Sequence, residues 1–150
     1  MVTTGVVITH VDLFATGAQT IVNTVNCFGV MGKGVALRFR RAYPDMYIDY
    51  ADRCRREEVK PGIPYLYVDR SGARIINFPT KNHWRYGSRI DWIDDGLRII
   101  AERAKEWGIT SLAMPLPGCG NGGLDRNQVI PLIETRLGRL GFQVFVCMGT

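Results

Sequence analysis

The sequence predicts one α/β domain, residues 1–150, with a central sheet that helices cover on both faces. Short runs of β-branched residues alternate with helical patterns along the chain, and this alternation is typical of a layered α/β fold. A length of 150 residues suits a single domain with a continuous core. Hydrophobic residues make up 46% of the chain and charged residues 22%, which indicates an ordinary globular protein.

The N-terminal half is expected to form four strands and one helical segment. The expected strands are 5–14, 18–26, 62–69 and 73–79. The stretch 34–58 has a helical pattern, in which we expect Pro44 to end one helix and Asp45 to cap the next. The turn Arg70–Ser71–Gly72 separates the last two strands.

The C-terminal half contains the clearest helical pattern of the chain, at 89–108, and we expect Gly108 to end this helix. Its apolar face consists of Ile90, Ile93, Leu97, Ile100, Ala101 and Ala104. We expect a buried strand at 111–116, a helix at 126–140 and a last strand at 143–148.

The composition excludes several classes of protein. The chain opens with no basic segment followed by a long apolar run, and no apolar stretch is long enough to cross a bilayer. We therefore expect a cytoplasmic protein that does not bind membranes. The four cysteines form no CxxC pair and only two histidines are present, so we expect reduced thiols and no metal. The net charge of +5 and the pI near 9.2 suit a polyanionic partner.

Three loops follow expected strands, at the edge where α/β folds bind their ligands. They read NCFGVMGKG after the second strand, PTKNHWRYGSR after the fourth and PGCGNGGLDRNQ after the fifth. The first and third loops are rich in glycine and precede helices, so each would offer backbone N–H groups and a helix dipole to a phosphate. Two such loops indicate a diphosphate held from two sides, and ordinary glycine-rich turns are the alternative.

The segments IVNTVN at 21–26, GVMGKGVA at 29–36 and PLPGCGNGGLD at 115–125 resemble the ADP-ribose-binding loops of macrodomains. The segment FPTKNHWR at 78–85 further resembles the macrodomains of bacterial DNA ADP-ribosyl glycohydrolases of the DarG type. Those proteins are antitoxins of DarT toxins and are related to terminal ADP-ribose protein glycohydrolase. The resemblance covers nearly the whole chain and implies a three-layer α/β/α macrodomain with a mixed central sheet.

The resemblance implies which residues bind ADP-ribose. Asp12 matches the aspartate that accepts a hydrogen bond from the adenine amine, and a strand-end aspartate that caps a turn is an equal alternative. Asn23 and Asn26 match asparagines that meet the distal ribose, but buried asparagines also tie loops together. The other implied contacts are Leu13, Gly32, Lys33, Gly34, Val35, Pro117, Gly118, Cys119, Gly120, Asn121, Gly122, Gly123 and Leu124.

The resemblance also implies where the chemistry comes from. Many hydrolytic macrodomains carry a catalytic aspartate just after the first glycine loop, but Ala36 stands there in this chain. Lys81 matches a lysine that serves relatives as the nucleophile, whereas its position alone favours a solvated surface lysine. We expect burial and the charge of Arg85 or Lys33 to lower its pKa. Asp125 is expected to relay a proton, to cap the following helix, or to do both.

The function that the resemblance implies is removal of ADP-ribose from DNA, from thymidine in single strands. The enzyme would be a monomeric antitoxin without a cofactor, with a cognate ADP-ribosyltransferase toxin as its partner. His83, Trp84, Arg85 and Tyr86 suggest contacts with DNA, in which Trp84 and Tyr86 stack on bases while Arg85 and Arg89 meet phosphates. Packing of Trp84 under its loop, with solvated arginines, is the alternative. Two other functions stay open: cleavage of ADP-ribosyl carboxylate esters on proteins, and binding of ADP-ribose without catalysis.

Overall fold

The central sheet of the computed structural model, which describes residues 5–149, has six strands in the order β1-β6-β5-β2-β4-β3. The strands are β1 (Val6–Thr9), β2 (Thr20–Asn26), β3 (Tyr65–Val68), β4 (Arg74–Lys81), β5 (Ser111–Pro115) and β6 (Gln143–Cys147). Every neighbouring pair is parallel except β3 and β4, which run antiparallel. The mixed sheet is therefore confirmed.

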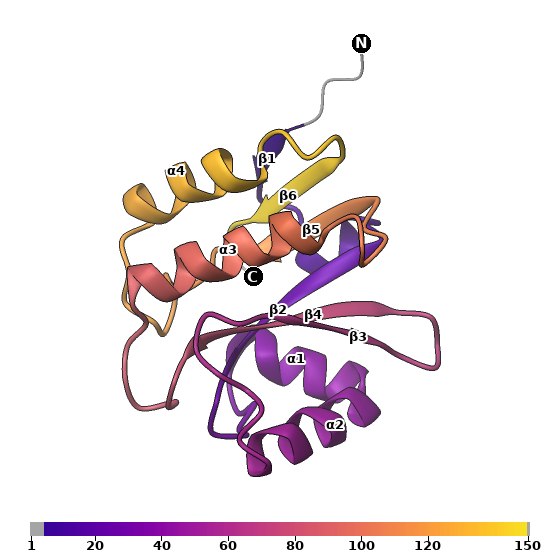
Figure 1. The fold of residues 1–150 in the computed structure, drawn as a ribbon, viewed down its shortest axis with the longest axis vertical. Helices are drawn as coiled ribbons and strands as arrows, with labels where there is room; N and C mark the ends of the chain where they lie inside the picture. The colour runs from indigo at the N-terminus through magenta and orange to yellow at the C-terminus, as the bar shows by residue number, and fades with distance from the viewer. Residues whose placement is uncertain (1–4, 150) are drawn as a thin grey trace.

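Four helices in residues 5–149 cover the two faces of this sheet (Figure 1). They are α1 (Gly34–Ala42), α2 (Pro44–Arg55), α3 (Ile90–Arg103) and α4 (Arg126–Leu137), and a short 3-10 helix, η1, spans Leu13–Ala15. Helices α3 and α4 lie on one face, and α1 and α2 lie on the other. This three-layer arrangement brings the carboxyl ends of β2, β4, β5 and β6 to one edge of the sheet.

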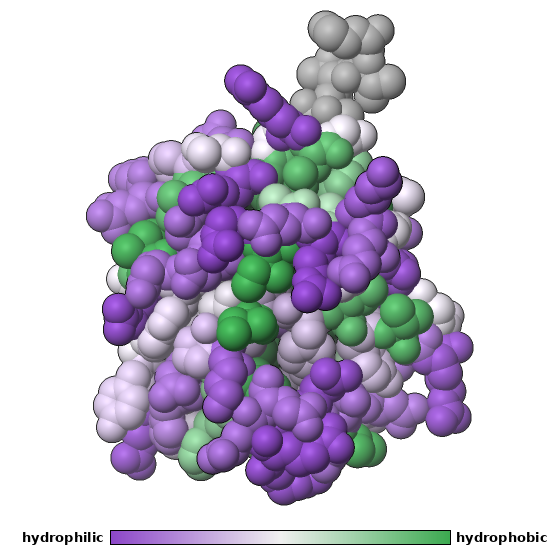
Figure 2. Space-filling view, in the orientation of Figure 1, coloured by the Kyte–Doolittle hydropathy of each residue, from purple (hydrophilic) through white to green (hydrophobic). Residues whose placement is uncertain are grey.

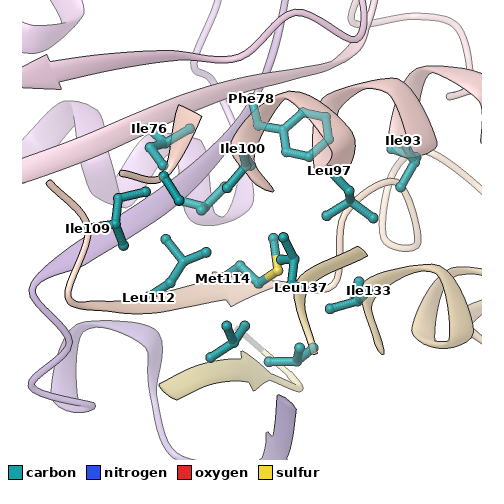
Figure 3. Close-up of a cluster of buried hydrophobic side chains, with 14 of the residues drawn as sticks. Ile76, Phe78, Ile93, Leu97, Ile100, Ile109, Leu112, Met114, Ile133 and Leu137 are labelled. Carbon is teal, nitrogen blue, oxygen red and sulfur yellow. The ribbon is translucent and has the colours of Figure 1, made fainter. Parts of the chain in front are cut away.

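The core between the sheet and the helices α3 and α4 is a single hydrophobic cluster (Figure 3). Ile93, Leu97 and Ile100 of α3 are fully buried, as their helical spacing predicted. Fully burying a side chain of this size contributes about 1.5–3 kcal/mol. Gly96 allows α3 to approach the sheet closely, because a Cβ atom at this position would lie 2.3 Å from ring atoms of Phe78.

A second hydrophobic cluster lies on the opposite face, around α1 and α2. Phe39 and Tyr50 are its largest fully buried side chains. The face of the molecule shown in Figure 2 is mostly hydrophilic, with a few separate hydrophobic patches. None of the helices in residues 5–149 combines the length and the apolar character that crossing a membrane requires.

The boundary between α1 and α2 differs from the prediction. Pro44 is the first residue of α2 and does not end the helix before it, because α1 already ends at Ala42. Tyr43 occupies the capping position of α2, so Asp45 lies in the first turn and is not the cap. Proline suits the first helical position, because the N–H that it lacks would have no partner there.

Two other elements end earlier than predicted. The first expected strand stops at Thr9, and the chain then forms η1, which Asp12 caps by accepting the N–H of Phe14 at 3.2 Å. Helix α3 ends at Arg103. Gly108, which was expected to end it, closes the following turn with a φ of +67°.

Three further differences concern single residues. Ile90 is 39% exposed at the start of α3, so the buried face of this helix begins one turn later. Helix α4 stops at Leu137, and Gly138 follows as its C-cap, with its N–H donated to the carbonyl of Glu134. Strand β4 extends beyond the predicted 73–79 and ends at Lys81.

Candidate functional site

A cavity of about 930 Å³ opens at the carboxyl ends of β2, β4, β5 and β6. Its walls come from the three loops expected to form a site, together with the first turns of α1 and α4. The predicted residues that line it are Asn26, Gly32, Lys33, Gly34, Val35, Lys81, Trp84, Arg85, Gly118, Cys119, Gly120, Asn121, Gly122, Leu124 and Asp125. This volume lies within the usual range of small-molecule sites.

Asn26 organises the first glycine loop, residues 27–33. Its side-chain oxygen accepts the backbone N–H groups of residues 28–30 at 2.9, 3.1 and 3.4 Å. Its side-chain nitrogen donates to the carbonyl of Val30 at 2.7 Å. The buried hydroxyl of Tyr50 donates to the backbone carbonyl of Asn26 at 2.7 Å. The geometry therefore supports the alternative in which this asparagine ties the loop together.

Helix α1 begins at the cavity without a side-chain cap. Lys33 occupies the capping position, but its side chain makes no capping hydrogen bond. The N–H groups in the first turn of a helix have no partner within the helix, and the dipole adds partial positive charge there. Gly34 starts the helix with a φ of +57°, which glycine adopts at low cost. This end of α1 is therefore suited to an anionic group.

The second glycine loop, residues 116–125, is closed by its own backbone and by the neighbouring loop. Leu124 donates its N–H to the carbonyl of Gly118 at 2.9 Å, and Ser88 donates its N–H to the carbonyl of Gly122 at 2.9 Å. A Cβ atom at Gly122 would lie 2.4 Å from both the Gly118 carbonyl oxygen and the Ser88 hydroxyl. Close packing, rather than an unusual backbone angle, therefore requires glycine at this position.

Asp125 caps α4, and this part of the prediction is confirmed. Its carboxylate accepts the backbone N–H of Asn127 at 2.9 Å. The partial positive charge at the N-terminus of α4 is therefore already compensated by the carboxylate of Asp125. Each glycine loop was expected to offer N–H groups and a helix dipole to a phosphate. The N-terminus of α1 has no side-chain cap, whereas the dipole of α4 is already compensated by Asp125.

Lys81, the last residue of β4, contacts both the loop that follows it and the second glycine loop. Its Nζ donates to the carbonyl of Trp84 at 3.0 Å and to the carbonyl of Asn121 at 3.3 Å. Burial and, second to it, the positive charge of Lys33 lower the pKa of Lys81. The predicted direction of the pKa shift is confirmed, with Lys33 as the neighbouring charge rather than Arg85.

Positive charge dominates the lining of the cavity. Its cationic side chains are Lys33, Lys81, Arg85 and Arg126, whereas Asp125 is the one carboxylate among the described lining residues. None of these four cations forms an ion pair with a carboxylate in residues 5–149. The cavity is therefore suited to a ligand with several negative charges.

Asp12 and Leu13, which the resemblance assigned to ADP-ribose, do not line this cavity. Leu13 is fully buried. The carboxylate of Asp12 pairs with Arg38 through two contacts of 2.6 and 3.0 Å, and this pairing lowers the pKa of Asp12. Burial and then the nearby charge of Asp12 raise the pKa of the Cys147 thiol. Cys147 lines the cavity and pairs with Thr9 at the end of β1, so Asp12 follows the strand that borders the β6 end of the cavity.

Asn23, also assigned to ADP-ribose, is fully buried and does not reach the cavity. Its side-chain nitrogen donates to the side-chain oxygen of Asn77 at 3.0 Å and lies 3.8 Å from the sulfur of Met31. The residue belongs to the middle of β2, beneath the layer of α1 and α2, whereas Asn26 ends the strand. The position of each asparagine in the strand was the signal that could have told which one reaches the cavity, because Asn23 lies in the middle of β2 and Asn26 lies at its end.

The remaining predicted contacts divide into two groups. Pro117, Gly123, His83 and Tyr86 do not line the cavity, whereas Trp84 and Arg85 do. Trp84 is 45% exposed, so it does not pack under its loop. Arg89, which was expected beside Arg85 to meet phosphates, instead donates two hydrogen bonds of 3.0 Å to Asp91.

Other lining residues were not predicted. They are Thr24, Val25, Val30, Thr80, Pro115, Leu116, Arg126, Cys147, Met148 and Gly149. Arg126 directly follows Asp125 at the start of α4, so the glycine loop itself was a signal for it. Residues 147–149 reach the cavity because β6 lies between β1 and β5, an order that no local pattern in the sequence reports.

The chain belongs to the macrodomain family, because the model of the Macro domain matches residues 22–133. The DNA ADP-ribosyl glycohydrolase of Thermus aquaticus is 43% identical over 139 residues, which cover 90% of this chain and 39% of that protein. The chain thus spans about two fifths of the length of this curated relative.

Two solved structures with high similarity are a DarG macrodomain and a DarTG protein. The macrodomain of Mycobacterium tuberculosis DarG has a TM-score of 0.90 at 39% identity, with 97% of each chain covered. Thermosipho africanus DarTG in complex with ADP-ribose has a TM-score of 0.91 at 38% identity, covering 96% of this chain and 41% of that one. The implied three-layer macrodomain fold is confirmed.

Proposed function

We propose that this macrodomain removes ADP-ribose from ADP-ribosylated DNA, from thymidine in single strands, and releases free ADP-ribose. The observation that carries the proposal is the position of Lys81. Its Nζ lies in the cavity against the second glycine loop, and its pKa is lowered. The activity named for the Thermus aquaticus relative supports the same reaction.

In this proposal the diphosphate of ADP-ribose binds at the N-terminus of α1. The uncapped first turn and the Lys33 side chain supply N–H groups and positive charge there. Gly120 of the second loop leaves open space beside the ligand, because nothing lies within 4 Å of a Cβ built on it. Asp12 follows β1 beside the β6 end of the cavity, and its carboxylate accepts a hydrogen bond from the adenine amine in addition to those from Arg38. The ADP-ribose bound in Thermosipho africanus DarTG supports this ligand.

Lys81 is the proposed nucleophile. Its neutral amine bonds to the anomeric carbon of the ribose while the bond from that carbon to the leaving base breaks. Of the two amine protons, one goes to the base and one to the ring oxygen as the sugar ring opens, which leaves an imine. Water then adds to the imine carbon, the carbon–nitrogen bond breaks, and free ADP-ribose leaves with the amine restored.

The neighbours of Lys81 support this role. An amine with the ordinary pKa of about 10.4 is almost entirely protonated at neutral pH, so burial and Lys33 favour the reactive form by lowering the pKa. Asp125 lines the same cavity and relays protons between the amine, the sugar and the base while it caps α4. No carboxylate lies at Ala36 to activate water directly.

The charge around the cavity favours DNA over protein as the substrate. Arg85 and Arg126 line the cavity and pair with no carboxylate in residues 5–149, so they can meet phosphates next to the modified nucleotide. We further propose that the domain acts as a monomer in the cytoplasm and counteracts an ADP-ribosyltransferase toxin. The combined name DarTG of the Thermosipho africanus relative supports such a partner.

One observation favours a second function, a reader that binds ADP-ribose without cleaving it. The Nζ of Lys81 donates to two backbone carbonyls, and an ammonium held in this way bridges two loops without acting as a nucleophile. In that case Lys81 orders the site and the ligand leaves unchanged.

The test is incubation of the wild-type domain and Lys81→Ala with ADP-ribosylated single-stranded DNA and, separately, with protein carrying ADP-ribosyl carboxylate esters. We expect wild-type release of ADP-ribose from DNA, and a loss on the order of 10³-fold in the variant. Calorimetry should show ADP-ribose affinity within a few-fold of wild type. Release from the protein alone would indicate the ester hydrolase, and release from neither substrate would indicate the reader.

A further inference from the structure

Four aromatic rings lie in contact beside the cavity and are not explained by the core of the fold. We call Phe28, His83, Trp84 and Tyr86 the aromatic platform. The ring of His83 is at its centre, with centroids 4.5 Å from Phe28, 5.3 Å from Trp84 and 5.5 Å from Tyr86. Such distances are typical of stacked and tilted aromatic pairs.

Backbone contacts hold the aromatic platform together across two loops. Phe28 belongs to the first glycine loop, and the other three rings belong to the loop after β4. Cys27 donates its N–H to the carbonyl of Asn82 at 3.2 Å, which fixes Phe28 beside His83. The Nδ1 atom of His83 accepts the N–H of Arg85 at 3.1 Å, which fixes the orientation of the imidazole ring.

The platform exposes a large apolar surface to solvent. Phe28 is 58% exposed, Trp84 is 45% exposed and Tyr86 is 68% exposed. Burying a phenylalanine side chain contributes about 1.5–3 kcal/mol to stability. The three exposed rings of the platform do not gain this full contribution. Adjacent exposed rings of this kind mark a surface for a partner.

The platform is continuous with the cationic cavity. Trp84 lines the cavity as well as contacting His83. The guanidinium of Arg85 lies 5.1 Å from the centre of the Trp84 ring and also lines the cavity. A chain that leaves the cavity at this point therefore meets a positive charge and an exposed aromatic face together.

We propose that the aromatic platform binds unpaired bases that flank the ADP-ribosylated nucleotide of single-stranded DNA. This inference rests on the proposed function, because the modified nucleotide has to occupy the cavity. Bases have flat faces that stack on Phe28, Trp84 and Tyr86, while Arg85 meets the backbone phosphates. Phe28 is therefore a substrate-positioning residue, although it lies in the first glycine loop and not in the segment that resembles DarG.

Single strands suit the platform better than duplex DNA. In a duplex the faces of the bases are already stacked on their neighbours, so exposed rings gain nothing from them. Stacking of one base on an aromatic side chain is worth about 1–3 kcal/mol and tolerates any base. The proposal therefore predicts a preference for unpaired strands with little dependence on the flanking sequence.

The first experiment measures fluorescence anisotropy of labelled, unmodified oligothymidylate with the wild-type domain and with Phe28→Ala, Tyr86→Ala and Phe28→Tyr. We expect each alanine variant to weaken binding on the order of tenfold, and Phe28→Tyr to retain it, because a tyrosine ring stacks equally well. Ile48→Ala is the matched control, because Ile48 is 63% exposed on α2 and does not line the cavity. Thermal unfolding checks that each variant is folded.

The same measurement with duplex DNA, and a second one with modified substrates, complete the test. We expect weaker binding of the duplex, and a rise in KM for an ADP-ribosylated oligonucleotide in Phe28→Ala that exceeds any rise for ADP-ribosylated thymidine. Equal affinity for both forms of DNA, or unchanged oligonucleotide binding in the alanine variants, would overturn the platform proposal. Failure of the proposed function is distinguishable, because the anisotropy experiment needs no turnover.

Discussion

Helices α1 and α4 both begin directly after a glycine-rich loop at the same cavity, yet their first turns differ. The first turn of α1 has no side-chain cap, and the residue at its capping position is the cation Lys33. The first turn of α4 is capped by the carboxylate of Asp125, which accepts the N–H of Asn127. One helix end thus offers partial positive charge to a ligand, and the other has this charge neutralised within the chain.

The loops before the two helices are also stabilised in different ways. The first glycine loop is held by a side chain at the end of β2, because Asn26 accepts three of its backbone N–H groups. The second glycine loop is held by its own backbone, where Leu124 donates to Gly118, and by the neighbouring residues Ser88 and Lys81. This difference shows that two similar glycine patterns can have different roles in one site. In the proposed function the first loop receives the anion, whereas the second shapes the cavity and accepts a hydrogen bond from the amine of Lys81.

The largest effect on stability is expected at Gly122, where the second loop packs most tightly. Gly122→Ala should lower the free energy of unfolding by about 2–3 kcal/mol, because its Cβ would overlap the Gly118 carbonyl and the Ser88 hydroxyl. Urea titration measures the change. Adding Ser88→Ala should not restore stability, since the backbone carbonyl stays in place. Gly120→Ala is the control and should unfold like wild type, because its Cβ points into open space.

A large side chain at Gly120 is expected to weaken ADP-ribose binding without lowering stability. The loss of binding free energy should be similar in size to the loss of stability in Gly122→Ala. Gly120→Leu fills open space that belongs to the cavity, so ADP-ribose affinity should fall on the order of 100-fold, which is about 2.7 kcal/mol. Isothermal titration calorimetry measures this affinity. Undiminished binding would remove the second loop from the ligand site and leave the first loop as the whole phosphate site.

A smaller effect separates the two roles of Asp125. Asp125→Ala removes the cap of α4 and should cost about 1 kcal/mol of stability, whereas Asp125→Asn keeps a capping side chain and should cost less. Both variants lose the carboxylate, so both should release ADP-ribose from DNA more slowly. Thermal unfolding and initial rates measure the two roles separately. Full activity in Asp125→Asn would limit this residue to capping.

The smallest effect is expected from the charge of Lys33 in the first glycine loop, which should shift the pH dependence of activity. Activity should rise with pH as Lys81 loses its proton, with a midpoint below the ordinary pKa of lysine, because burial and Lys33 lower the pKa of Lys81. Lys33→Gln removes the second of these causes and should move the midpoint upward without restoring the ordinary value. A pH–rate profile of each form measures the shift. Lys105→Gln, outside the cavity, should leave the midpoint unchanged.

The order of helices and strands was predictable, and so was the edge of the sheet that carries the site. β-branched runs and the apolar face of α3 depend on neighbours a few residues apart, so the sequence reports them directly. The ends of elements were less predictable. Pro44 starts α2 instead of ending α1, because proline is compatible with both positions and the packing of the two helices chooses between them.

The sequence alone determined that this chain is a layered α/β protein with two glycine loops and a lysine at one edge of its sheet, because local patterns encode all of these. Tertiary structure decided which members of those patterns reach the cavity. Asn23 lies under α1 and α2, Asp12 pairs with Arg38, and Phe28 meets His83. Each of these outcomes depends on residues distant in the chain, whose approach is set by strand order and packing and not by neighbouring sequence.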